Sequence, residues 1–151
     1  RLGNHFWGFE MHDITPDIMI LGKPMGNGHP IAAVVTTQHI ADTFANGMEF
    51  FTSFGGNPVS CAVALELLNI IKEEDLAKNA ARVGDALKNG LIDLQKQFDC
   101  LGDVRGEGLF LGIEFIDKQG KQSEEIANFI KEDLKKRFIL VGTDGPYHNV
   151  I

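Results

Sequence analysis

The pattern of apolar and polar positions predicts a mixed α/β fold. Residues 18–21 contain no polar side chain, as expected of a strand buried on both faces, and residues 31–37 form a second run rich in β-branched residues. The segment between them is shorter than the roughly dozen residues that a parallel crossover needs. We therefore expect these two strands to pair antiparallel, followed by a short helix over 38–45.

Two longer helices are expected next. Asn57 suits an N-cap and Pro58 suits a first helical position, so the pattern predicts a largely buried helix from residue 58 to about 73. A long helix should follow from Asp75 to about Phe98, because apolar residues recur there three and four positions apart. Glycines at 84 and 90 would mark close packing along it.

In the last third of the chain, the pattern of apolar and polar residues changes. Residues 103–108 read as a turn-rich lead into a strand over 109–116, and a further strand is expected over 138–141. Between them, Ser123 precedes a helix with acidic residues in its first turn and basic residues in its last turn, which complements the helix dipole.

These elements suggest two domains joined by a helix. Residues 1–74 are expected to form the end of an α/β domain, residues 75–98 an interdomain helix, and residues 99–151 the start of a smaller α+β domain. The chain starts at Arg1 without a methionine and stops at Ile151 on what looks like the approach to another strand, so we expect it to be an internal stretch of a longer polypeptide.

Composition narrows the function classes. A hydrophobic content of 44% supports a real core, and a formal net charge of −7 without a basic stripe argues against nucleic-acid binding. No apolar run is as long as a membrane span. Cys61 and Cys100 lack metal-ligand spacing, and His5 and His12 have no ligand partners, so we expect no metal site and a reducing, cytoplasmic location.

Lys23 is the first candidate for chemistry. It follows the apolar run 18–21 and opens a loop rich in glycine and proline, where an ammonium group costs free energy unless it is paired or used covalently. On position alone, a solvated loop lysine is the favoured alternative. A phosphate-binding loop would need Ser or Thr after the lysine, and Pro24 stands there.

A second candidate site precedes the helix that begins at Pro58. Thr52 and Ser53 offer hydroxyl groups, Gly55 and Gly56 offer unobstructed N–H groups, and the positive end of a helix lies next to them. The stretch can therefore hold an anion. An ordinary glycine turn with a helix cap explains the composition equally well.

Three motifs carry a family resemblance. Residues 16–30 (PDIMILGKPMGNGHP), 53–58 (SFGGNP) and 104–109 (VRGEGL) together resemble the class III aminotransferases. Residues 4–10 and 144–150 are similar to a narrower branch, which includes alanine–glyoxylate aminotransferase-like proteins and phospholyases acting on phosphoethanolamine and phosphohydroxylysine.

The resemblance implies a fold-type I enzyme that uses pyridoxal 5'-phosphate, with a mostly parallel sheet in its large domain. Lys23 would form the Schiff base with the cofactor aldehyde, and Ser53 would reach the cofactor phosphate of the neighbouring subunit, with Thr52 as the less favoured substitute. A homodimer with shared active sites follows. The resemblance gives Arg105 no catalytic role, and other residues of the site should lie outside this chain.

Three functions are open at this point. The leading one is transfer of an amino group from an amine or amino acid to a 2-oxo acid or glyoxylate through Lys23. The second is an ammonia-forming phospholyase that eliminates phosphate from a phosphorylated amine. The third is a catalytically incomplete fragment or dimerisation module, against which an intact Lys23 and glycine loop count.

Overall fold

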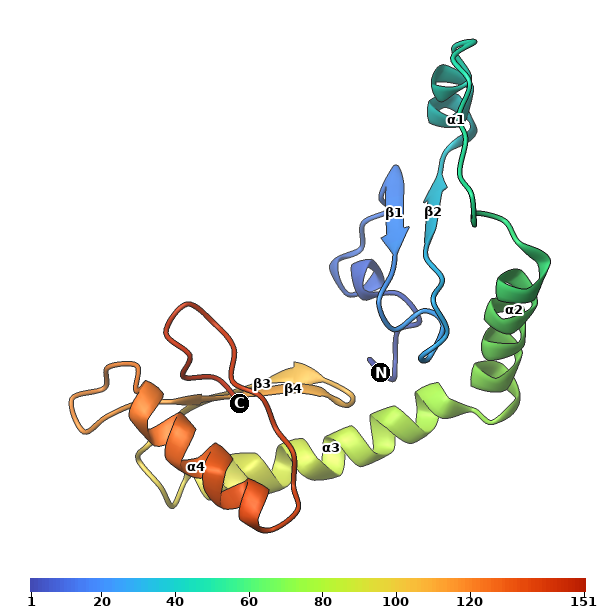
Figure 1. Ribbon diagram of the computed structural model, residues 1–151. Coiled ribbons are helices and arrows are strands. Elements are labelled where there is room, and N and C mark those ends of the chain that lie inside the picture. Colours follow the sequence, from blue (N-terminus) through green and yellow to red (C-terminus); the bar gives the residue numbers. More distant parts are fainter. The chain divides into compact units, whose positions relative to one another are not determined.

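The computed structural model describes all 151 residues, and they form two compact units, each described separately here (Figure 1). The first unit is His5–Leu76, and the second combines Arg1–Asn4 with Ala77–Ile151. The expected division into domains at 74 and 98 stays a prediction for a longer protein. The elements of the first unit are the 3-10 helix η1 (Gly8–His12), β1 (Ile18–Leu21), β2 (Ala33–Thr36), α1 (Gln38–Phe44) and α2 (Pro58–Glu73).

Strands β1 and β2 pair antiparallel, as predicted, with Ile18 opposite Thr36 and Leu21 opposite Ala33. The expectation that β1 is buried on both faces is wrong for this chain, since Ile20 is 78% exposed. The reason is that no helix packs on this two-stranded sheet. Both strand pairs of the chain are antiparallel, so the parallel part of the expected sheet is not among these strands.

Helix α2 begins and ends where the sequence predicted. The Asn57 side chain accepts a hydrogen bond from the backbone N–H of Ser60 at 2.9 Å, and Pro58 occupies the first turn. The predicted burial is wrong, because only Ser60 and Ala64 are buried in this helix while Leu65 is 61% exposed. Within this unit the apolar side of α2 has too little to pack against.

The second unit contains α3 (Leu76–Gln95), β3 (Leu101–Glu107), β4 (Phe110–Phe115) and α4 (Glu124–Lys136). Helix α3 ends a turn before Phe98, although the Phe98 N–H still bonds to the Leu94 carbonyl at 3.0 Å. Gly84 marks close packing, as predicted, because a Cβ there would overlap the Gly108 carbonyl oxygen. Gly90 does not, since nothing lies within 4 Å of such an atom.

Strand β3 was not expected, because its glycines and acidic residues suggested a turn. It pairs antiparallel with β4 from Leu101 to Glu107, with an irregularity in register near Asp103. Pairing of this length overrides the weak β propensity of the sequence. Helix α4 packs against β4, where Phe115 and Ala127 are buried, and the Ser123 hydroxyl accepts the Ile126 N–H at 3.3 Å as the predicted cap.

The predicted strand over 138–141 is wrong. These residues form no strand, Phe138 has a left-handed φ of 62°, and Leu140 is 90% exposed. An extended segment needs a neighbour to satisfy its backbone, and no strand of this chain pairs with it. The chain instead returns to the hairpin at its end, where the Ile113 N–H bonds to the Ile151 carbonyl at 2.7 Å.

None of the helices combines the length and the apolar character that crossing a bilayer would require. Both cysteines are free thiols.

Candidate cofactor site

Lys23 follows the end of β1 after a single glycine. Its side chain is exposed, so the expected burial at a strand end is not found in this chain. Its backbone is unusual: φ is +42°, a left-handed conformation that a residue with a side chain adopts at a cost of about 1–3 kcal/mol. Such a conformation persists only where the surroundings impose it.

The loop after Lys23 has a defined shape. Three backbone hydrogen bonds wind it into successive turns, from Met25 to Gly22 at 3.1 Å, from Asn27 to Pro24 at 3.0 Å and from His29 to Gly26 at 2.9 Å. Gly26 is buried, and a Cβ there would overlap the His29 carbonyl oxygen. The loop therefore holds the Lys23 backbone in place.

In the stretch before α2, the two candidate hydroxyl groups, those of Thr52 and Ser53, have different surroundings. Thr52 Oγ1 accepts the Gly55 N–H at 3.3 Å, and a Cβ at Gly55 would overlap the Thr52 methyl group, so Thr52 shapes the turn. Ser53 is exposed and its hydroxyl has no hydrogen-bond partner. Both O–H groups can still donate to a ligand, but only the Ser53 hydroxyl is not already tied to the turn as an acceptor.

Asn57 joins this turn to the helix. Its Nδ2 donates to the Phe54 carbonyl at 2.8 Å while its Oδ1 accepts the Ser60 N–H. One side chain thus fixes both the turn that follows Ser53 and the first turn of α2.

One contact of this region was missed in the sequence. A hydrogen bond of 2.8 Å joins His29 Nε2 to Ser60 Oγ, linking the loop after Lys23 to the start of α2. The two residues are 31 positions apart, and no motif pairs them, so only a structure could reveal the contact.

The candidate residues lie in one unit but are not joined by any polar contact. No hydrogen bond or ion pair joins Lys23 to Thr52 or Ser53. Their chemistry nevertheless fits the expected cofactor, because an exposed primary amine can bond to an aldehyde and a free hydroxyl beside a helix N-terminus can hold a phosphate. No group of three His, Cys, Asp or Glu side chains is placed to hold a metal ion.

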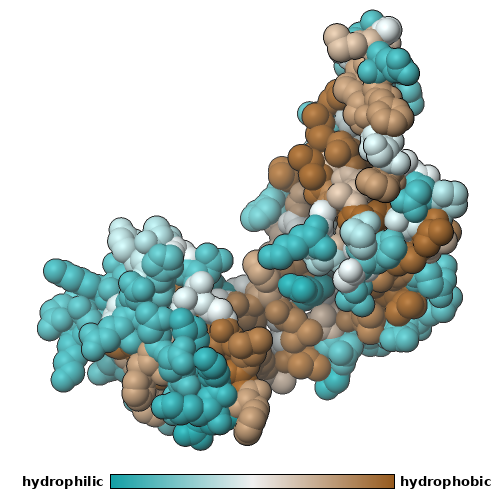
Figure 2. Space-filling view, in the orientation of Figure 1, coloured by the Kyte–Doolittle hydropathy of each residue, from teal (hydrophilic) through white to brown (hydrophobic).

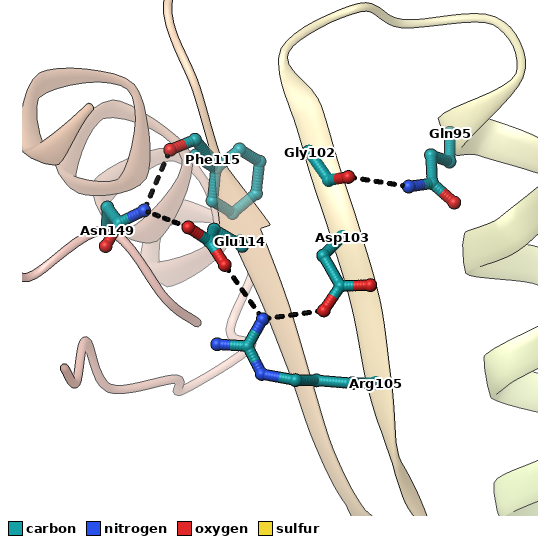
Figure 3. A network of polar contacts seen from close by, with 7 residues as sticks. All are labelled: Gln95, Gly102, Asp103, Arg105, Glu114, Phe115 and Asn149. Carbon is teal, nitrogen blue, oxygen red and sulfur yellow. Dashed lines mark hydrogen bonds and ion pairs between the residues drawn. The ribbon is translucent and has the colours of Figure 1, made fainter. Parts of the chain in front are cut away.

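Arg105 belongs to a separate polar network in the second unit (Figure 3). Its Nη1 donates to Asp103 Oδ2 at 2.8 Å and to Glu114 Oε2 at 2.9 Å, and these hydrogen bonds raise the pKa of the guanidinium above its usual value. Asn149, only 2% exposed, donates from Nδ2 to the Phe115 carbonyl at 3.0 Å. Arg105 therefore has the structural ion-pair role that the sequence suggested.

The chain resembles known proteins along its whole length. It is 45% identical over 155 residues to alanine–glyoxylate aminotransferase 2-like of Drosophila melanogaster, covering 100% of this chain and 31% of that protein. The chain thus spans about a third of the length of the curated relatives it matches.

Two solved structures share its fold. A phospholyase from Arthrobacter in complex with phosphoethanolamine has a TM-score of 0.95 and 39% identity, covering 99% of this chain and 36% of that chain. An amine transaminase from an uncultivated Pseudomonas species, in a PLP-bound form, has a TM-score of 0.83 and 30% identity over 99% of this chain and 36% of that one. The α/β fold expected from the sequence is thereby confirmed as that of the PLP-dependent aminotransferases.

The family model described as aminotransferase class-III matches residues 2–148. Together with the motifs around Lys23 and Ser53, this match shows that the chain belongs to the class III aminotransferase family.

Proposed function

We propose that the full-length protein is a pyridoxal-phosphate-dependent aminotransferase that moves an amino group from an amine or amino acid to a 2-oxo acid or glyoxylate. The observation that carries the proposal is the placement of Lys23, an exposed amine with a strained backbone just after β1. The loop that contains it is held in shape by hydrogen-bonded turns and by a buried glycine. Membership of the family supports the cofactor.

When bound, pyridoxal phosphate supplies an aldehyde that condenses with amines and a ring that accepts electron density from the substrate Cα. Lys23 supplies the amine that holds the aldehyde carbon in the resting enzyme. With a substrate amine bound, Lys23 Nζ would be free to accept the proton from the substrate Cα and to return it to the reacting molecule. These two tasks need a primary amine, which arginine cannot replace.

Ser53 supplies a hydroxyl donor for the cofactor phosphate. The positive end of α2 lies next to it, which favours a bound anion. In the proposed homodimer this hydroxyl serves the neighbouring subunit's cofactor, which is consistent with the lack of a hydrogen bond between Ser53 and Lys23. The exposed aromatic side chains beside it, Phe51 at 79% and Phe54 at 84%, support a covered surface in the dimer.

The cofactor assignment can be tested in the full-length protein. Apo-protein is titrated with pyridoxal phosphate, the visible band is followed, and borohydride reduction then fixes the cofactor to the lysine that holds it. We expect the reduced cofactor on Lys23 and no such band in Lys23→Ala, whereas Lys72→Ala, an exposed lysine of α2, should behave as wild type. A Lys23→Ala protein with the same borohydride-reducible band would overturn the assignment.

Ser53→Ala tests the phosphate contact. We expect weaker retention of the cofactor on dialysis. Unchanged retention would move the contact to Thr52 or to backbone N–H groups.

A second function is favoured by one observation, the TM-score of 0.95 to a phospholyase in complex with phosphoethanolamine. The same lysine chemistry would then end in elimination of phosphate from a phosphorylated amine. Supplying phosphoethanolamine without an amino acceptor separates the two, because only a phospholyase would release phosphate and ammonia. Failure both to release these products and to transfer an amino group to any tested 2-oxo acid would favour a catalytically incomplete protein.

A further inference from the structure

We propose that His29 and Ser60 are positioning residues for the cofactor site, because their hydrogen bond sets the Lys23 loop relative to the segment that carries Ser53. This inference rests on the proposed function. Neither side chain is placed in contact with the cofactor, so both would act through Lys23 and Ser53.

The contact itself is short and partly buried, with Ser60 as its buried partner. His29 Nε2 and Ser60 Oγ are 2.8 Å apart, and Ser60 is only 9% exposed. A hydrogen bond shielded from water is expensive to leave unmade, because the remaining partner loses its solvation without replacement.

The bond extends into both candidate segments. On one side, the His29 N–H bonds to the Gly26 carbonyl, and Gly26 lies in the turns that hold Lys23. On the other side, the Ser60 N–H bonds to Asn57, whose Nδ2 reaches the Phe54 carbonyl, directly after Ser53. An unbroken series of hydrogen bonds and backbone turns therefore runs from the lysine loop to the anion-binding turn.

This connection has few substitutes within its unit. Only Gly26, Ser60 and Ala64 are buried in His5–Leu76, and two of these three belong to the connection. No helix packs on β1 and β2 that could set their position instead. Within the part of the protein that this chain spans, the contact is one of the few that can set where the loop lies.

The test measures affinity for pyridoxal phosphate in full-length apo-protein by absorbance titration. Ser60→Ala and His29→Leu should each weaken binding about tenfold, the effect of leaving one shielded partner unpaired. Ser60→Thr keeps the hydroxyl and should stay within about twofold of wild type. Ser123→Ala is the matched control, because it removes a helix-capping hydroxyl from the other unit.

A double variant separates positioning from general weakening. If the two side chains act through their mutual bond, Ser60→Ala with His29→Leu binds the cofactor no more weakly than either single variant. Additive losses would overturn the inference, as would a lowered melting temperature with unchanged cofactor affinity. Should Ser60→Ala fail to fold, cofactor affinity is compared between His29→Gln, which retains a polar group, and His29→Leu. Equal affinities of these two variants would then overturn the inference.

Failure of the proposed function has a different signature. If wild-type protein binds no pyridoxal phosphate, that function falls and this inference falls with it. If wild type binds it through Lys23 and the His29 and Ser60 variants bind it equally well, only this inference is wrong.

Discussion

The two units of the chain keep their shape by different means. His5–Leu76 relies on turns, a helix cap and one partly buried polar contact, and it leaves large apolar side chains in the open, among them Ile20 at 78% and Val34 at 67% exposed. The second unit has buried residues on several elements, including Val104, Phe115 and Ala127. Figure 2 shows brown, hydrophobic residues over much of the first unit, whereas the surface over α4 is largely teal.

The difference between the two units suggests that the candidate reactive groups lie in one unit and most of the stabilising packing in the other. The candidate reactive groups sit on exposed, backbone-defined loops of the first unit, where a side chain can change without disturbing a core. The second unit carries no candidate reactive group and is held by close packing and a polar network. Substitutions in the two units should therefore affect different measurements.

The largest effect is expected from Lys23→Ala. If Lys23 transfers protons as proposed, its loss lowers turnover by on the order of 10²–10⁴-fold. Because the Lys23 side chain is exposed in this chain, the melting temperature of the apo-protein should barely change, whereas the cofactor-loaded protein loses the stabilisation that the bound cofactor gives. Turnover and thermal unfolding of the full-length protein are measured together, and a variant whose apo-protein unfolds early would show that the first unit also depends on Lys23 for stability.

Two glycines of α3 offer a matched pair in the second unit. Gly84→Ala places a Cβ against the Gly108 carbonyl and should destabilise the unit by about 1–3 kcal/mol. Gly90→Ala meets nothing within 4 Å and should stabilise the helix by about 0.5–1 kcal/mol. Hydrogen exchange of the α3 amides reports both, and equal effects at the two positions would contradict the packing.

Asn149→Ala removes a buried side chain from the polar network. The Phe115 carbonyl loses one of its two donors but keeps the Ser123 N–H at 3.0 Å, so the cost should be about 1 kcal/mol. The loss should appear as faster hydrogen exchange at the chain end that pairs with β4, with cofactor affinity unchanged. A changed affinity would mean that the two units are not independent.

Arg105→Met should have the smallest effect, below about 1 kcal/mol. Arg105 is 49% exposed and Asp103 53%, so water and salt screen that ion pair, and the pair with Glu114, which is 24% exposed, is screened less. The destabilisation should shrink further as the salt concentration rises. A loss of activity without loss of stability would instead indicate a catalytic role for Arg105, which the resemblance did not assign.

Local signals in the sequence predicted several elements well. Asn57 and Pro58 defined the start of α2 because capping is a local property of neighbouring residues. The short link between β1 and β2 determined their direction for a similar reason.

Features that depend on distant partners were missed or wrong. Strand β3 exists because β4 pairs with it, and residues 138–141 form no strand because nothing pairs with them. The apolar runs in β1 and α2 indicated burial, but burial needs a covering element that this unit does not contain. The contact between His29 and Ser60 needs both segments in place before it exists.

The hairpin of β1 and β2 has a practical consequence for handling this chain. Ile20 lies opposite Val34 in the register, and both side chains are largely exposed on a sheet of only two strands. Unpaired strand edges beside an apolar surface are templates for aggregation. Expressed alone, His5–Leu76 would precipitate or be captured by chaperones, so the inactivity of such a piece would report on its solubility rather than on Lys23.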